Sequence, residues 1–159
     1  MDATSLGGEL SQVRMDGLIV DRDHTEYDKY RRIWNGLADR RPAAIVRALT
    51  VDDVKKTVKI AADQGALLAV RSGGHSLPGL STCDDGIVLD LSLINNVAVD
   101  VAAGVAEVGG GALLGDLDKA GARAGLVTPG RRRLAHRSCR THVGRRHGMA
   151  EPEVRIDHR

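Results

Sequence analysis

The sequence predicts an α/β-like α+β fold, in which helices flank a small mixed sheet. The first sign is a strand–helix–strand succession over residues 43–70, which favours two parallel strands joined by a right-handed crossover. The second is a pair of short apolar runs, 97–101 and 105–108, with a turn between them over residues 100–104. Such a pair is typical of an antiparallel hairpin. Because parallel and antiparallel strands are both expected, the sheet is expected to be mixed.

The crossover helix has a well-defined start and end in the sequence. Thr50 is a good N-cap after the strand predicted over residues 43–49, and Asp53 three residues later completes a capping-box pattern. Gly65 follows Gln64 as a glycine C-cap. Apolar residues at helical spacing predict the buried face as Val51, Val54, Val58, Ala61 and Ala62.

The other predicted elements are shorter. Strands are expected at 65–70 and 87–91, and a helix at 112–124 with Gly125 as its cap. The inner face of that helix is predicted as Leu113, Leu114, Leu117, Ala120 and Ala124. Residues 27–40 predict a short helix or turn that ends near Asn35-Gly36, whereas residues 1–26 are polar and weakly patterned.

The aromatic residues of the chain all lie in one short segment. They are Tyr27, Tyr30 and Trp34, whose spacing places them on one face of a helix. We interpret them as a cover over the edge of the core.

A glycine-rich loop joins the strands predicted at 65–70 and 87–91, and the rest of the chain is organised around it. We call residues 71–81 the glycine loop; its residues run R-S-G-G-H-S-L-P-G-L-S. Glycines let backbone N–H groups converge on an anion, Ser72 and Ser76 add hydroxyl donors, and Arg71 adds positive charge at the loop's mouth. The loop therefore suits a pyrophosphate, with His75 as a possible nucleophile, base or ligand.

The glycine loop is not a dinucleotide-binding fingerprint of the Rossmann type. That motif opens a helix, and Pro78 with Gly79 prevents one here. The spacing alone is equally compatible with a surface turn that carries an incidental histidine. Gly109-Gly110-Gly111 leaves a similar choice, between a close approach of backbone to a cofactor and a sharp turn before a helix.

Composition limits the possible classes of protein. The 159 residues suffice for one domain with an aliphatic core, since the chain has no Phe and only 2% aromatic residues. Two cysteines, Cys83 and Cys139, make no disulfide framework, and we find neither a signal segment nor a membrane span, so a cytoplasmic protein is expected. Acidic neighbours should raise the pKa of the Cys83 thiol, which speaks against a nucleophile.

Several motifs resemble those of FAD-linked oxidoreductases of the vanillyl-alcohol-oxidase/para-cresol-methylhydroxylase (PCMH) type, in particular the berberine-bridge-enzyme-like branch. The glycine loop carries the string R-S-G-G-H-S, with a glycine three residues on. Further matching segments follow in the family's order and spacing: 30–36, 41–46, 52–54, 88–92, 108–112 and 125–130. The resemblance covers about residues 27–130. It implies the first subdomain of a PCMH-type FAD-binding domain.

The resemblance also implies a cofactor, a reaction and site residues. FAD would bind through Arg71, Ser72, Gly73, Gly74, His75, Ser76, Leu77, Gly79, Gly109, Gly110 and Gly111. The loop histidine commonly carries the flavin covalently in this branch, so His75 is the candidate attachment point. The implied activity is oxidation of a small organic or sugar-like substrate by hydride transfer to FAD. No catalytic base is assigned, because in the family it lies beyond the part that matches.

The resemblance stops at Gly130, and the composition changes there. Residues 131–159 hold nine of the 23 basic residues and three of the 21 acidic ones, which leaves 14 and 18, a net charge of −4, in the rest. We expect a disordered, Arg-rich tail. Read one nucleotide late, the codons of Met149 and Ala150 must give Trp, and residues 134–150 admit a family-like G-G-G-M-G-W-L ending. We therefore expect the tail to be a frameshift product and the enzyme to be truncated.

Two other functions stay open. The chain can be a catalytically inactive fragment with residual affinity for FAD. It can also bind nucleic acid through the Arg-rich tail, although that tail has no aromatic residues for base stacking and the acidic body would repel the partner. No metal site is expected, because the spacing of His136, Cys139, His142 and His147 fits no standard zinc pattern. No membrane partner is expected.

Overall fold

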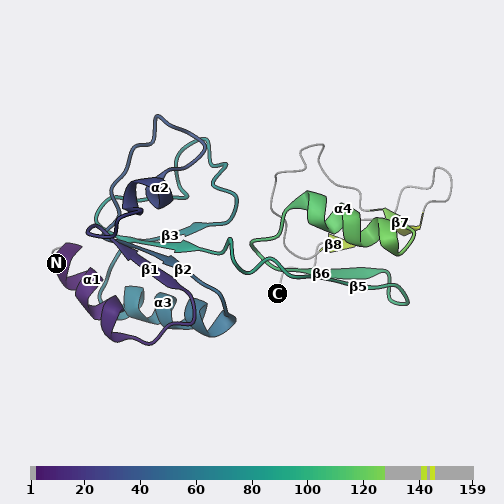
Figure 1. The fold of residues 1–159 in the computed structure, drawn as a ribbon, viewed down its shortest axis with the longest axis horizontal. Coiled ribbons are helices and arrows are strands. Elements are labelled where there is room, and N and C mark those ends of the chain that lie inside the picture. Colours follow the sequence, from purple (N-terminus) through teal and green to yellow (C-terminus); the bar gives the residue numbers. More distant parts are fainter. Residues whose placement is uncertain (1–2, 128–140, 143, 146–159) are drawn as a thin grey trace. The chain divides into compact units, whose positions relative to one another are not determined.

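The computed structural model describes residues 3–127, 141–142 and 144–145, and the chain forms two compact units that divide between Ile94 and Asn95. The predicted small mixed sheet with flanking helices is confirmed, and the structure also has separate small antiparallel sheets that include the predicted hairpin (Figure 1). Within the described residues, no helix is long and apolar enough to cross a membrane.

The first unit is built on a four-stranded sheet in the order β1-β2-β4-β3. Its strands are β1 (Leu18–Asp21), β2 (Ala44–Arg47), β3 (Leu68–Arg71) and β4 (Ile87–Asp90). Strand β1 is antiparallel to β2, whereas β2 and β3 both run parallel to β4. The two parallel strands predicted around the crossover helix are thus present, but β4 lies between them.

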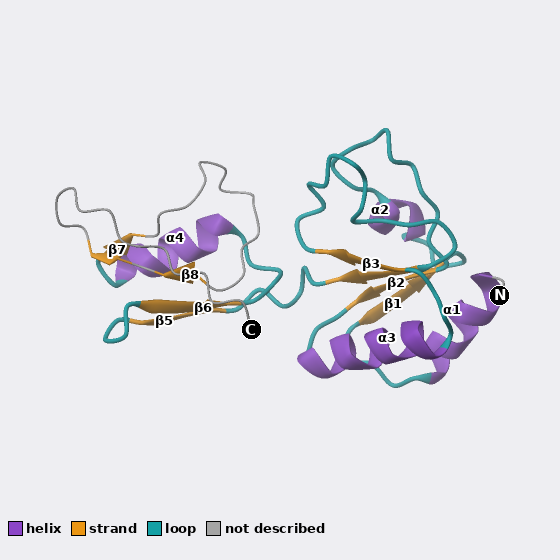
Figure 2. Ribbon diagram, turned by 180° about the vertical axis from the view of Figure 1, so that it is seen from behind, coloured by secondary structure: helices purple, strands orange, loops and turns teal. Residues whose placement is uncertain are grey.

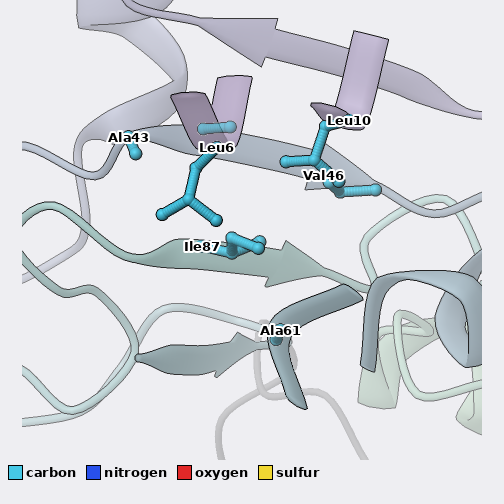
Figure 3. Packing of buried hydrophobic residues seen from close by; sticks show 7 residues of the cluster. Leu6, Leu10, Ala43, Val46, Ala61 and Ile87 are labelled. Carbon is cyan, nitrogen blue, oxygen red and sulfur yellow. The ribbon is translucent and has the colours of Figure 1, made fainter. Parts of the chain in front are cut away.

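Helices cover both faces of this sheet. Helices α1 (Ala3–Gln12) and α3 (Val51–Asp63) lie on one face and α2 (Tyr27–Arg31) on the other (Figure 2). The α1/α3 face buries the aliphatic cluster shown in Figure 3, and the α2 face buries a second cluster around Tyr27 and Ile45. Helix α1 and strand β1 come from the segment in which the sequence predicted no element. Leu6 and Leu10 place α1 in the core, although too few apolar residues mark it in the sequence.

The predicted caps of α3 are confirmed, but its predicted buried face is only partly right. Thr50 Oγ1 accepts from Asp53 N in a capping box, and Gly65 beyond the C-cap has a φ of +59°. Ala61 is buried as expected, whereas Val51 and Val58 are exposed. Asp53 and Thr57 occupy the buried face instead, because the Asp53 carboxylate accepts four backbone N–H groups there and the Thr57 hydroxyl donates to Asp53 O.

Helix α2 ends earlier than expected. The segment was predicted to end near Asn35-Gly36, but Arg32 is already extended, with φ −65° and ψ 141°. Tyr27 is buried and Tyr30 packs beside it, while Trp34 lies beyond the helix and is exposed. The interpretation that all three aromatic residues cover the core is therefore wrong for Trp34.

The second unit pairs a hairpin with one helix. Strands β5 (Val97–Asp100) and β6 (Val105–Val108) form the predicted antiparallel hairpin, and α4 (Leu114–Arg123) packs against it. Leu117 is fully buried, as predicted, but the prediction is wrong for Leu113, which is the N-cap residue of α4 and is exposed. Gly125 caps the helix with a φ of +68° before β7 (Leu126–Val127).

Most of the Arg-rich tail lies outside the described residues. Its predicted disorder there, and its predicted origin in a frameshift, stay predictions. The four described residues of the tail form β8 (Thr141–His142) and β9 (Gly144–Arg145), which pair with β6 and β7. At these residues the structure has strands where disorder was expected. Pairing of this kind uses backbone groups, so it needs no apolar pattern in the sequence.

Candidate cofactor-binding site

The glycine loop leaves the sheet at the carboxyl end of β3, and no helix follows it. Residues 72–86 contain only turns and irregular backbone before β4 begins. The prediction that the glycine loop opens no helix, unlike a Rossmann motif, is confirmed. The carboxyl ends of parallel strands are a common place for ligands in α/β sheets.

The path of the loop depends on two glycines. Gly74 and Gly79 have φ values of +67° and +74°, a region that other residues enter at a cost. At Gly79 a Cβ atom would also lie 2.8 Å from the Cβ of Ala38. Ser76 closes the turn between them, since its carbonyl accepts from Gly79 N at 3.2 Å and its Oγ accepts from Leu80 N at 3.0 Å.

A second segment, residues 32–43 between α2 and β2, lies alongside the loop (Figure 1, dark blue beside teal). The backbone N–H of Trp34 donates to the Gly74 carbonyl at 3.2 Å, and the Asn35 side-chain amide donates to the Leu77 carbonyl at 2.8 Å. Farther along, Arg41 N donates to the Asp84 carboxylate at 2.7 Å. The first two bonds hold the loop at Gly74 and Leu77, and the third holds the chain just beyond it.

Several donors of the loop remain for a ligand. Among the described residues, the backbone N–H groups of Gly73, Gly74, Ser76 and Leu77 donate no hydrogen bond. The hydroxyls of Ser81 and Thr82, in the same stretch, are buried and have no partner within the described part of the chain. Buried polar groups normally find a partner. These groups are donors of the kind that phosphate oxygens accept, so the residues fit a pyrophosphate.

The charge at the base of the loop belongs to an arginine–aspartate–arginine cluster. Arg71, Asp90 and Arg47 end the parallel strands β3, β4 and β2, and the register sets Asp90 opposite both arginines. Arg71 Nη2 lies 2.7 Å from Asp90 Oδ2, and Arg47 Nε lies 3.9 Å from the same oxygen. The Arg47 guanidinium also lies 4.6 Å from the centre of the Tyr30 ring, within the range of a cation–π contact.

The cluster changes the role expected for Arg71. Its side chain is buried and paired with Asp90, with a further contact of 3.5 Å from Nη1 to the Arg32 carbonyl. It is therefore no exposed charge at the loop's mouth. Arg47, Asp90 and Tyr30 were missed as site residues. A signal for the two charged residues exists, since each lies within two residues of the carboxyl end of a predicted strand, as Arg71 does; no such signal marks Tyr30.

His75 lies next to Trp34. Their ring centroids are 6.0 Å apart and their planes are tilted by 49°. His75 is part-buried, whereas the Trp34 side chain is 59% exposed. The loop thus presents an imidazole flanked by an exposed indole.

The three glycines before α4 lie in the second unit. Gly109 N donates to the Asn96 carbonyl, and the Gly109 carbonyl accepts from Ala112 N, which tightens the entry into the helix. Positive φ values among the described residues occur at other glycines, so the handedness of the turn does not require glycine at these three positions. Whether they approach a cofactor stays a prediction.

The remaining candidates give no second site within the described residues. No group of three His, Cys, Asp or Glu side chains there could hold a metal ion, and Cys139, His136 and His147 lie outside those residues. Cys83 is buried, and burial raises the pKa of its thiol, with Asp84 adding a smaller contribution in the same direction. The expected direction is confirmed, but desolvation is its main cause.

Fold and site together define a cofactor-binding domain of mixed α/β type. Residues 42–133 match the family model of the FAD binding domain, and the chain belongs to this family. An (R)-6-hydroxynicotine oxidase from Paenarthrobacter nicotinovorans is 43% identical over 113 residues, which is 71% of this chain and 25% of the relative.

Two solved structures are also similar to the chain. A 6-hydroxy-D-nicotine oxidase from Arthrobacter nicotinovorans superposes with a TM-score of 0.75 and 39% identity, over 78% of this chain and 27% of that one. A variant of berberine-bridge-enzyme-like protein 1 from Physcomitrella patens gives a TM-score of 0.72 and 25% identity, over 85% and 29%. The chain therefore spans about a quarter of the length of these relatives, and the resemblance to the berberine-bridge-enzyme-like branch is confirmed.

Proposed function

We propose that this chain is the FAD-binding part of an FAD-linked oxidoreductase, and that the glycine loop holds the pyrophosphate of the cofactor. The observation that carries the proposal is the set of loop N–H groups without an acceptor among the described residues, at the carboxyl end of β3 in a member of the FAD binding domain family. Converging backbone N–H groups of this kind bind anions well.

The proposal gives each site residue a role. Gly73, Gly74, Ser76 and Leu77 donate backbone N–H groups to phosphate oxygens, and Gly79 provides the turn that aims them. Ser72 adds a hydroxyl, and Arg71 fixes the base of the loop through Asp90. Gly109, Gly110 and Gly111 bring backbone near another part of the cofactor.

His75 is the proposed point of covalent attachment to the flavin. It is the imidazole of the loop and is part-buried beside Trp34. A bound flavin supplies the hydride acceptor for oxidation of an alcohol-like or amine-like carbon in a small organic or sugar-like substrate. We also propose a cytoplasmic location, on the basis of the buried thiol of Cys83.

The test is the visible absorbance of the purified chain before and after acid precipitation. Yellow colour that stays with the pellet, and is lost in His75→Ala, supports both FAD binding and the covalent link. Colour released to the supernatant supports FAD binding and contradicts the link at His75. A colourless protein that takes up no added FAD contradicts the proposal.

The alternative is a catalytically inactive fragment of the same family. The chain spans about a quarter of the length of the relatives that it matches. FAD binding without turnover of any amine or alcohol would support this alternative.

A further inference from the structure

The indole of Trp34 is exposed beside the loop histidine, although the fold does not require it there. Its ring lies 6.0 Å from that of His75, and Trp34 is the only tryptophan in the chain. Trp34 is 59% exposed, and Leu77, whose carbonyl accepts from the side chain of the neighbouring Asn35, is 71% exposed. Large exposed apolar groups that gather at one place often mark a binding surface.

The position of Trp34 is fixed by its backbone and not by burial of the ring. Its N–H donates to the Gly74 carbonyl, and the neighbouring Asn35 side chain donates to the Leu77 carbonyl. Neither bond involves the indole. A substitution of this ring should therefore leave the path of the loop intact, which separates its role from that of the loop backbone.

We propose that Trp34 contacts the flavin ring of FAD, and thereby makes the site prefer FAD over nucleotides that lack a flavin. The inference rests on the proposed function. An aromatic side chain beside the loop that holds the pyrophosphate suits a planar aromatic ligand, since aromatic pairs gain from stacking as well as from burial. The ADP half of the cofactor needs only the N–H groups and hydroxyls of the loop.

The test compares FAD with ADP. His75→Ala serves as the parent protein, so that binding is reversible, and calorimetric titrations give the Kd of each ligand. We expect Trp34→Ala to weaken FAD binding about tenfold and to change ADP binding less than about twofold, because the lost contact involves the flavin ring alone. Trp34→Phe, which keeps an aromatic ring, should retain most of the FAD affinity.

Leu37→Ala is the matched control. Leu37 lies three residues beyond Trp34 in the same segment and is 95% exposed. Its removal takes away a similar exposed apolar side chain and should leave both Kd values unchanged. In the parent protein, FAD should also quench the emission of Trp34, whereas ADP should not.

The outcomes separate the two proposals. Equal weakening of FAD and ADP in Trp34→Ala would mean that the indole supports the loop itself, and would overturn the inference. FAD binding that is insensitive to the substitution would overturn it as well, while leaving the proposed function standing. If neither the parent protein nor the unsubstituted chain binds FAD or ADP, both proposals are overturned.

Discussion

The side chains of Arg71 and Asp90 form a buried ion pair at the ends of two parallel strands, with Nη2 and Oδ2 2.7 Å apart. Asp90 Oδ1 also accepts from Ser92 N at 2.8 Å, and the Arg71 carbonyl accepts from Leu91 N at the same distance. The last residue of β3 is thus tied to the residues that end and follow β4. The glycine loop begins at the residue after Arg71.

Removal of the carboxylate should destabilise the first unit. Asp90→Asn leaves the Arg71 guanidinium buried without its counter-charge, which typically costs about 3–5 kcal/mol. Urea unfolding followed by circular dichroism measures this loss. Replacing both partners, as in Arg71→Met with Asp90→Leu, should recover part of it, because a buried pair can often be replaced by apolar residues at little cost while Arg47 still loses its counter-charge.

Asp63→Asn is the control for that experiment. Asp63 pairs with Lys59 at 2.7 Å on the exposed surface of α3, where an ion pair contributes about 0–1 kcal/mol. A loss in Asp90→Asn no larger than in this control would contradict the view that the pair anchors the loop.

Gly79 should tolerate substitution worse than Gly65, although both have positive φ values. A Cβ at Gly79 would lie 2.8 Å from that of Ala38, whereas nothing lies within 4 Å of one at Gly65. We expect Gly65→Ala to cost about 1–2 kcal/mol for the left-handed backbone alone, and Gly79→Ala to cost more. Thermal unfolding measures the loss of stability in each variant. Equal losses would mean that the structure relieves the close contact with Ala38 at no cost.

Much of the fold follows from local sequence signals. The strands with β-branched runs, the Thr50 capping box and the hairpin turn at Asp100 and Gly104 each depend on neighbours in the chain, and the structure has all of them. Helix α1 depends on packing against residues far along the chain, such as Ile87, and strand β1 depends on its pairing with β2, more than twenty positions away. The turn between α1 and β1 depends on the bonds from Asp16 N and Gly17 N to Asp53. A local pattern cannot reveal such contacts.

Some residues of the candidate site can be recognised from the sequence, and others only from the fold. The glycine loop and His75 stand out as a motif in the sequence, whereas the cluster of Arg71, Asp90 and Arg47 forms only when β4 inserts between β2 and β3. The strand order depends on pairing between segments far apart in the sequence. Trp34 was placed on a helix because its spacing from Tyr30 fits one, but the helix ends at Arg31.

The Asp53 carboxylate should make the stability of the first unit depend on pH. Burial is the largest single influence and opposes the charge, but N–H groups of Asp16, Gly17, Leu49 and Thr50 together outweigh it, so the pKa of Asp53 lies below its ordinary value. The folded state therefore binds this proton less readily than the unfolded state. Its contribution is fully present above the ordinary pKa of an aspartate, about 4, and is lost as the pH falls through the folded value.

Asp53→Asn gives the comparison for that pH dependence. An amide has one oxygen in place of the two that accept here, so the variant should lose at least about 2 kcal/mol at pH 7. Urea unfolding at several pH values between 7 and 3 measures the free energy of unfolding of the unsubstituted chain and of Asp53→Asn. The difference between the two free energies should become smaller in acid. A difference that stays constant over this range would mean that the charge of Asp53 contributes nothing to stability.

The exposed valines of α3 should accept a charge, although the sequence pattern assigned them to the core. Val58 is 45% exposed while Ala61, three residues later, is 3% exposed and packs in the cluster with Leu6 and Ile87. Val58→Lys should change the free energy of unfolding by no more than about 0.5 kcal/mol, as is usual for surface positions. Ala61→Lys should prevent stable folding, because it forces an unpaired charge against the sheet. Urea unfolding of the two variants measures both changes. A large loss of unfolding free energy in Val58→Lys would mean that Val58 lies on the buried face of α3, as the apolar spacing predicted.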